Sequence, residues 1–254
     1  MAPKKLKHVA IGEGLRLIPK AAEVETAEHA EGITEAGGIP PIESRLRHNI
    51  LRLPEEIKKA SGIVIYGRKI RSLLYTTDIA LIRNNDADAI FCVYPFTASR
   101  AISAAVIHAA STPVFCGVGG GTTQGVRSVY LATDAENQGA MGVVLNAPMP
   151  NRDVRSIARV IDIPIVVTVV SEKTDVGKRV SNGAAIINVA AGAQTPELVK
   201  KIRASFPRLP IMASGGKTAD SIKATIKAGA NAIVYTPPTS HELFAKIMDT
   251  YRER

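Results

Sequence analysis

The sequence contains no tryptophan, and aromatic residues make up only 4% of it. Nucleic-acid-binding surfaces commonly place aromatic side chains among basic ones, and no stretch of this chain does so. Eight of the nine net positive charges come from residues 61–254, because residues 1–60 hold ten Lys or Arg against nine Asp or Glu. This excess is spread over several predicted helices. We therefore interpret it as solvated helix faces that attract anionic metabolites, and we do not expect a nucleic acid partner.

Long apolar runs are also missing. None approaches the ~18–20 residues that span a bilayer, and glutamates stand where a signal peptide would be apolar. We expect a cytoplasmic protein with no membrane partner. The two cysteines, Cys92 and Cys116, fall in apolar runs, where buried thiols are expected rather than a disulfide. The five histidines show no zinc-ligand spacing, so no metal site is predicted from them.

The most informative stretch runs from Leu209 to Thr239. An apolar run, Pro210 to Ala213, ends in Ser214-Gly215-Gly216, and a helical pattern then precedes a second apolar run, Ala232 to Tyr235. This order predicts strand, glycine turn, helix and strand. Glycines at the end of a buried strand let the backbone approach a ligand, and the amides at a helix N-terminus bind anions.

The same alternation extends through residues 61–254. Strands are expected at 73–77, 89–94, 113–118, 142–146, 163–169, 184–189, 210–213 and 232–235. Apolar residues spaced by three and four predict helices at 79–84, 98–110, 123–138, 152–161, 174–181, 196–206, 218–228 and 241–252. Eight alternating pairs predict an α/β fold, a (β/α)8 TIM barrel. An open doubly wound sheet is disfavoured because the first strand-to-helix turn, 75–78, has no glycine.

Residues 1–60 differ from the remainder. They are rich in glutamate from Glu13 to Glu35 and too polar to form a core of their own. We expect an N-terminal extension packed on the barrel or on a partner subunit, with short helices at 21–30 and 54–60, and we predict a homo-oligomer. The two apolar runs that follow, 62–67 and 70–77, are both strand candidates. One of them closes the barrel floor and the other is the first barrel strand.

The turn Ala213-Ser214-Gly215-Gly216 resembles the seventh-strand motif of phosphate-binding TIM barrels. That group includes ribulose-phosphate-binding enzymes, aldolases and thiamin-phosphate synthase, which usually carry a glycine after strand eight where this chain has Thr236-Pro237-Pro238. The position and the resemblance together imply a phosphate held at the ends of the last two strands. The residues expected to hold it are Ser214, Gly215, Gly216, Thr236 and Ser240.

A second run of glycines follows the third predicted strand. Backbone amides of Gly119, Gly120, Gly121 and Thr122 are a candidate loop for a second anion. The alternative is a tight turn or a flexible lid without a ligand.

Candidates for acid–base chemistry are scarce at the predicted strand ends. Asp78 after strand one and Glu172 after strand five would lie on opposite sides of the mouth, similar to the paired acids of sugar isomerases of the histidine and tryptophan pathways. Asp78 is equally a helix N-cap candidate, and Glu172 a surface residue. Asn146 and Asn188 are candidates to orient the substrate, and Lys217 either pairs with the phosphate or is solvated. Strand six carries no lysine, which disfavours a Schiff-base aldolase.

Together these patterns predict an enzyme that acts on a small phosphorylated metabolite, as an isomerase or lyase of a phosphosugar-like compound. A hydrolase on the same scaffold and a non-catalytic sensor of a phosphorylated ligand stay open as alternatives. The sequence requires no cofactor. It is compatible with Mg²⁺ held by Asp78 or Glu172 together with a substrate phosphate, because Mg²⁺ needs only one or two carboxylates.

Overall fold

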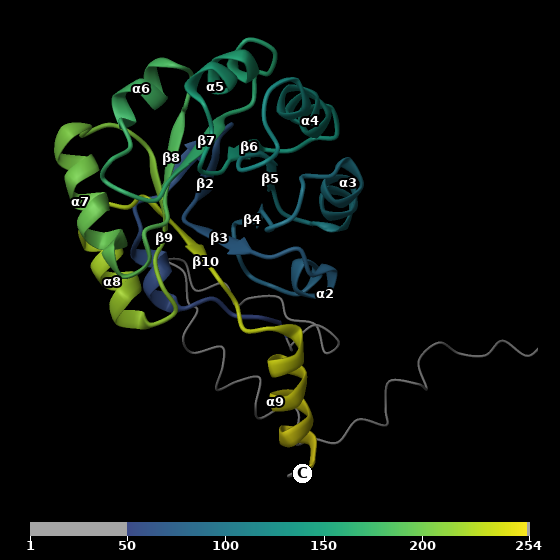
Figure 1. Cartoon of the computed structure of the whole chain (residues 1–254). Coiled ribbons are helices and arrows are strands. Elements are labelled where there is room, and N and C mark those ends of the chain that lie inside the picture. Colours follow the sequence, from purple (N-terminus) through teal and green to yellow (C-terminus); the bar gives the residue numbers. More distant parts are fainter. Residues whose placement is uncertain (1–49, 253–254) are drawn as a thin grey trace, which may run out of the picture. The chain divides into compact units, whose positions relative to one another are not determined.

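The computed structural model describes residues 50–252, and its central feature is a closed barrel of eight parallel strands (Figure 1). The last strand pairs with the first, Val234 lying beside Leu73, so the barrel has no free edge. Each strand overlaps a predicted apolar run, which confirms the TIM-barrel prediction. The strands are β3 (Ser72–Tyr75), β4 (Ala89–Cys92), β5 (Val114–Gly119), β6 (Gly142–Leu145), β7 (Ile165–Val169), β8 (Ile186–Val189), β9 (Ile211–Ser214) and β10 (Ala232–Tyr235).

A helix follows every barrel strand, as the spacing of apolar residues predicts. The helices from α2 to α8 surround the barrel, and α9 runs away from it in Figure 1. Their bounds are α2 (Ile79–Arg83), α3 (Arg100–Ala109), α4 (Val126–Asn137), α5 (Asn151–Ala158), α6 (Val176–Ser181), α7 (Thr195–Ser205), α8 (Ala219–Lys227) and α9 (Ser240–Arg252), with a 3₁₀ turn, η3 (Gly192–Gln194), before α7. No helix among residues 50–252 is long and apolar enough to cross a membrane.

Side chains alternate between the two faces of each strand and form two apolar clusters. On β7, Ile165, Val167 and Val169 pack under the helices, whereas Val166 belongs to the cluster inside the barrel. Both clusters are dominated by aliphatic residues, and Phe91 and Phe115 are the large aromatic members of the inner one. The inward register of each strand therefore sets which residue comes next at the barrel mouth.

A short hairpin closes the opposite end of the barrel. It consists of β1 (Ile63–Ile65) and β2 (Arg68–Ile70), which pair antiparallel. Ile63, Ile65 and Ile70 pack into the inner cluster. Of the two strand candidates near residue 70, the run at 62–67 thus lies in the floor hairpin, and the first barrel strand is β3.

The last residues of the predicted extension pack on the barrel. The Leu53 amide donates to the Asp86 carboxylate at 2.8 Å, and Glu56 pairs with Lys223 of α8 at 3.5 Å. The helix predicted at 54–60 is a 3₁₀ turn, η2 (Glu55–Lys59), which buries Ile57. Residues 1–49, including the helix predicted at 21–30, lie outside the described residues, so the role of the extension as a whole stays a prediction.

Cys92 and Cys116 are free, buried and opposite each other on β4 and β5, as predicted. Burial raises the pKa of the Cys92 thiol to about 11 and that of Cys116 to about 12. Both thiols therefore stay protonated at neutral pH.

Candidate functional site

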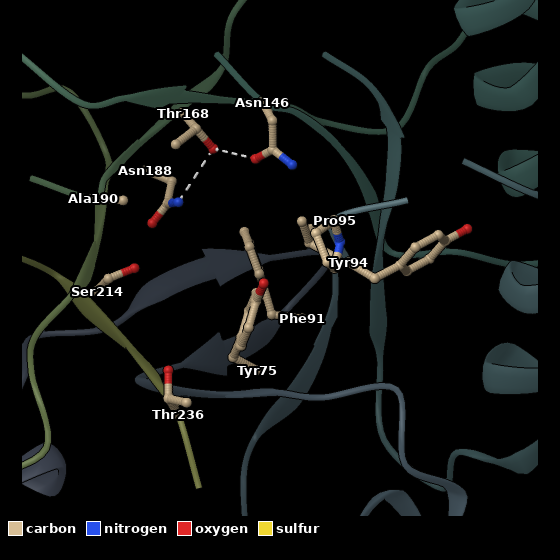
Figure 2. A pocket seen from close by; sticks show the side chains of 11 residues that line it. Tyr75, Phe91, Tyr94, Pro95, Asn146, Thr168, Asn188, Ala190, Ser214 and Thr236 are labelled. Carbon is tan, nitrogen blue, oxygen red and sulfur yellow. Dashed lines mark hydrogen bonds between the residues drawn. The ribbon is translucent and has the colours of Figure 1, made fainter. Parts of the chain in front are cut away.

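A cavity of about 260 Å³ opens at the carboxyl ends of the barrel strands (Figure 2). Its lining continues the inward register of the strands: Tyr75 lies two residues beyond Leu73, Thr168 beyond Val166, and Asn188 beyond Ile186. The floor of the cavity is thus the top of the inner core. The lining residues are Tyr75, Phe91, Val93, Tyr94, Pro95, Asn146, Thr168, Asn188, Ala190, Ser214 and Thr236.

The polar lining is made of hydroxyl and amide groups. The titratable side chains in it are Tyr75 and Tyr94, and burial is the main cause that raises the pKa of each. Tyr94 accepts a hydrogen bond from the Ser99 amide at 2.8 Å, whereas the Tyr75 hydroxyl has no partner among the described residues. Both phenols are neutral at pH 7, so Tyr75 can offer a proton or a hydrogen bond to a ligand.

Three of the lining side chains form a chain of hydrogen bonds. The Asn188 amide nitrogen donates to Thr168 Oγ1 at 3.3 Å, and that hydroxyl donates to Asn146 Oδ1 at 3.1 Å. Asn188 is 3% exposed, and its Oδ1 has no hydrogen-bond partner in the part of the chain that the structure describes. Of these three residues, Asn146 and Asn188 are predicted from the sequence to orient the substrate. Thr168 is not predicted, although it continues the inward-facing alternation of β7.

The turn after β9 presents free backbone amides. Gly215, Gly216 and Lys217 make no backbone hydrogen bond to another residue within 50–252, and Gly216 has a φ of +81°. The next residue, Thr218, is the N-cap of α8 and forms a capping box with Ser221. The Thr218 side chain accepts a hydrogen bond from the Ser221 amide, and the Ser221 hydroxyl accepts one from the Thr218 amide. The cap engages the amides of Thr218 and Ser221, and the three amides before it pair with no other residue among 50–252. Ser214 lies in the cavity lining, and the exposed Gly216 and Lys217 lie beyond it.

On the neighbouring strand, Thr236 lines the cavity but Ser240 does not. The Ser240 hydroxyl donates to one carboxylate oxygen of Asp78, and the other oxygen of Asp78 accepts from the amides of Ala80 and Leu81. Asp78 is therefore the N-cap of α2, one of the two alternatives that the sequence left open. These hydrogen bonds, that from Ser240 first, lower the pKa of Asp78.

Glu172 also lies outside the cavity lining. It pairs with Lys201 of α7 at 2.6 Å, and both side chains are about half exposed. The structure thus brings Asn146, Asn188, Ser214 and Thr236 to one cavity, and it does not bring Asp78, Glu172 or Lys217 there. Tyr75 and Phe91 line it without having been predicted to do so.

The glycine run after β5 borders a second, smaller cavity of about 40 Å³, which shares Asn146, Val93 and Tyr94 with the first. Two of its amides are engaged within the chain. Gly120 donates to the Thr123 carbonyl at 2.9 Å, and Gly121 donates to the Pro148 carbonyl at 3.0 Å. These bonds agree with the tight-turn alternative, and a second anion at Gly119 to Thr122 stays a prediction.

The cavity is poorly suited to Mg²⁺. Its lining contains no carboxylate, and residues 50–252 contain no cluster of three His, Cys, Asp or Glu side chains. The two carboxylates that the sequence offered for the ion, Asp78 and Glu172, are held in the contacts described above. Neutral hydroxyls and amides alone are not the donor set that Mg²⁺ takes in proteins.

Neither protein-family models nor curated proteins match this sequence. Several solved structures share the fold. A 2,3-dimethylmalate lyase, described as a member of the PEP mutase/isocitrate lyase superfamily, is 12% identical with a TM-score of 0.55, over 78% of this chain and 84% of its own. A phosphonopyruvate hydrolase solved with oxalate and Mg²⁺ is 12% identical with a TM-score of 0.53, over 72% and 80%. A dihydrodipicolinate synthase from Agrobacterium tumefaciens is 14% identical with a TM-score of 0.50, over 72% of each chain.

These likenesses establish the barrel fold. They do not confirm the particular group of ribulose-phosphate-binding barrels that the seventh-strand turn resembles, because the proteins above carry other names.

Proposed function

We propose that this protein binds a small phosphorylated metabolite in the barrel mouth and converts it as an isomerase or lyase. The observation that carries the proposal is the set of three unpaired amides at Gly215, Gly216 and Lys217, beside the hydroxyls of Ser214 and Thr236. Free amides that precede a helix N-terminus are suited to a phosphate, because they donate hydrogen bonds and the helix dipole favours negative charge. The ammonium group of Lys217 adds a nearby positive charge.

The reaction class is proposed from the fold likeness and from the side chains near the cavity. Proteins of similar fold are described as a lyase and a hydrolase, so a hydrolase stays the alternative to an isomerase or lyase. Asp78 and Glu172 would have to leave their present partners to act on a ligand in this cavity. Tyr75 already lies in the lining, and as a neutral phenol it is the acid that the cavity itself supplies.

Non-catalytic binding of a phosphorylated ligand is the second candidate. It is favoured by the composition of the lining, which contains no carboxylate, histidine or lysine. The phosphonopyruvate hydrolase was solved with Mg²⁺, but this chain offers the ion no suitable donor set in the cavity, so no step is assigned to a metal. A homo-oligomer and a cytoplasmic location stay predictions.

A thermal-shift screen of phosphorylated metabolites, each beside its dephosphorylated parent, tests the proposal. At 100 times the dissociation constant, a ligand adds about 2.7 kcal/mol of stability. Gly216→Asp should abolish the shift, because it puts a carboxylate beside the free amides. Gly121→Asp is the control for the added charge: it also changes an exposed glycine of positive φ, 63° against 81°, but on the turn after β5, where the Gly120 and Gly121 amides are engaged. The two sites differ in space, because a Cβ would lie 2.5 Å from Ser221 Oγ at Gly216 and meets no described atom within 4 Å at Gly121.

The proposal fails if no phosphorylated compound stabilises the protein, or if both aspartate variants lose the shift equally. With a binding compound in hand, turnover of wild type is compared with Asp78→Asn, Glu172→Gln and Tyr75→Phe. A turnover that one of these abolishes while binding persists supports the enzyme. Binding without any turnover supports the non-catalytic candidate.

A further inference from the structure

The Asn188 side chain is almost completely buried, yet its carbonyl oxygen is unsatisfied. The residue is 3% exposed, and Oδ1 has no hydrogen-bond partner among residues 50–252. In Figure 2 this oxygen points away from Thr168, toward the side on which Ser214 lies. A buried acceptor without a donor is destabilising, and native proteins rarely leave one unless a ligand or an ordered group completes it.

The hydrogen bonds around Asn188 run in one direction. The Thr168 hydroxyl has a single proton, which it donates to Asn146 Oδ1, so it must accept from the Asn188 amide nitrogen. The two ends of the chain are therefore different. Asn188 offers an acceptor, Oδ1, and Asn146 offers a donor, Nδ2, for which no partner is found within residues 50–252.

We propose that this pair of amides selects a hydroxylated ligand: a short-chain phosphate ester in which a hydroxyl donates to Asn188 Oδ1 and an adjacent oxygen accepts from Asn146 Nδ2. A vicinal diol or an α-hydroxy carbonyl has this pattern of one donor beside one acceptor. The inference rests on the proposed phosphate site and adds the chemistry of the remaining part of the ligand.

The groups proposed to bind the hydroxyl and the phosphate lie on neighbouring strands. Asn188 of β8 and Ser214 of β9 come from paired strands and line the same cavity, so a few bonds separate the hydroxyl from the phosphate. A volume of about 260 Å³ is at the small end for ligand pockets, which also favours a short carbon chain.

The same lining disfavours a fully ionised dicarboxylate such as oxalate. Such an ion carries no donor for Asn188 Oδ1, and two oxygens would face each other in a buried site. The dicarboxylate would also lack a neutralising cation, because the cavity lining has no cluster of carboxylates to hold a metal ion.

Isothermal titration calorimetry with glycerol 3-phosphate and propyl phosphate tests the inference, because the two esters share the phosphate and differ in the hydroxyls. We expect wild type to bind glycerol 3-phosphate about tenfold more tightly, as one or two hydrogen bonds to a buried amide provide. Asn188→Leu, of similar size, should bind both esters equally, with propyl phosphate unaffected. Asn188→Asp keeps an acceptor at this position and should retain the preference while weakening both esters.

Thr236→Val is the matched control on the phosphate side. It should weaken the two esters by the same factor and leave their ratio unchanged. Equal affinities of wild type for the two esters, or an unchanged ratio in Asn188→Leu, would overturn the inference and leave phosphate binding intact. Tighter binding of oxalate with Mg²⁺ than of glycerol 3-phosphate would overturn it as well. If neither ester binds, the inference fails, and the thermal-shift screen of other phosphorylated metabolites decides whether the proposed function fails with it.

Discussion

Two glycine turns lie across the barrel mouth from each other, and they use their backbones differently. In the turn after β5, the amides of Gly120 and Gly121 donate to carbonyls at Thr123 and Pro148. In the turn after β9, the amides of Gly215 and Gly216 donate to no other described residue. The β5 turn contains more glycine, but the β9 turn has more unused donors. The number of glycines therefore does not identify an anion site; the hydrogen bonds left unmade are the better guide.

The largest loss of stability is expected when a methyl group is added at Gly120, in the turn after β5. A Cβ at Gly120 would lie 2.5 Å from the Asn146 carbonyl oxygen, and its φ of +124° is unfavourable for an L residue. Gly120→Ala should lower the free energy of unfolding by about 3 kcal/mol, because backbone strain and a backbone clash act together. Denaturant titration measures the loss. A loss under about 1 kcal/mol would mean that this turn is not held as tightly as its hydrogen bonds indicate.

An intermediate effect on stability, which disappears at low pH, is expected near the turn after β9. Asp78 links α2 to the start of α9 through Ser240, and this hydrogen bond, with those from Ala80 and Leu81, lowers its pKa. A carboxylate whose folded pKa lies below its unfolded value, about 3.9, contributes stability above that pH and loses it as the pH falls through the folded pKa. Wild type should therefore lose its advantage over Asp78→Asn as acid is added.

The comparison uses unfolding free energies of the two proteins between pH 6 and pH 2.5. Asparagine can still cap α2 through its single side-chain oxygen, so the difference reports the carboxylate charge together with the hydrogen bond from Ser240. A constant difference over this range would show that Asp78 contributes nothing through its ionised form.

The smallest effect should come from Gly121→Ala. A Cβ at this glycine meets no atom within 4 Å, so the positive φ of 63° is the main penalty, about 1 kcal/mol. Binding of phosphorylated compounds should be unchanged. If Gly121→Ala weakened such binding as much as Gly216→Asp is expected to, the two turns would not differ in function and the contrast between them would be lost.

The barrel itself was predictable from the sequence. Strands buried on both faces appear as continuous apolar runs, such as residues 165–169 after Pro164, and the helices between them keep apolar spacings of three and four. The floor hairpin was less certain, because two short apolar runs near residue 70 both qualified as the first strand.

The site was only partly predictable. Asn146, Asn188, Ser214 and Thr236 stand out as polar residues at strand ends, and all four line the cavity. Thr168 did not stand out, because a β-branched residue in an apolar run looks like ordinary strand sequence. The missed residues, Thr168 and Tyr75, are found by counting two positions onward from an inward-facing strand residue. Thr168 follows Val166 in this way, and Tyr75 follows Leu73.

The partners of the two carboxylates could not be deduced from local sequence. Glu172 meets Lys201, 29 positions later, and Asp78 meets Ser240, 162 positions later. Such contacts depend on how the loops fold over the mouth, which the spacing of residues within one segment does not encode.

Phe91 belongs both to the inner core, where it is 2% exposed, and to the lining of the cavity. Its ring lies 6.4 Å from that of Tyr75, and the isoleucines of the floor hairpin pack into the same inner cluster. Deepening the cavity would therefore mean removing core volume, at about 3–5 kcal/mol for a buried phenylalanine. A descendant of this protein that accepts longer ligands would have to gain room at the rim of the cavity, by lengthening the loops there. Its specificity would then change through the rim loops, while the depth of the cavity stayed the same.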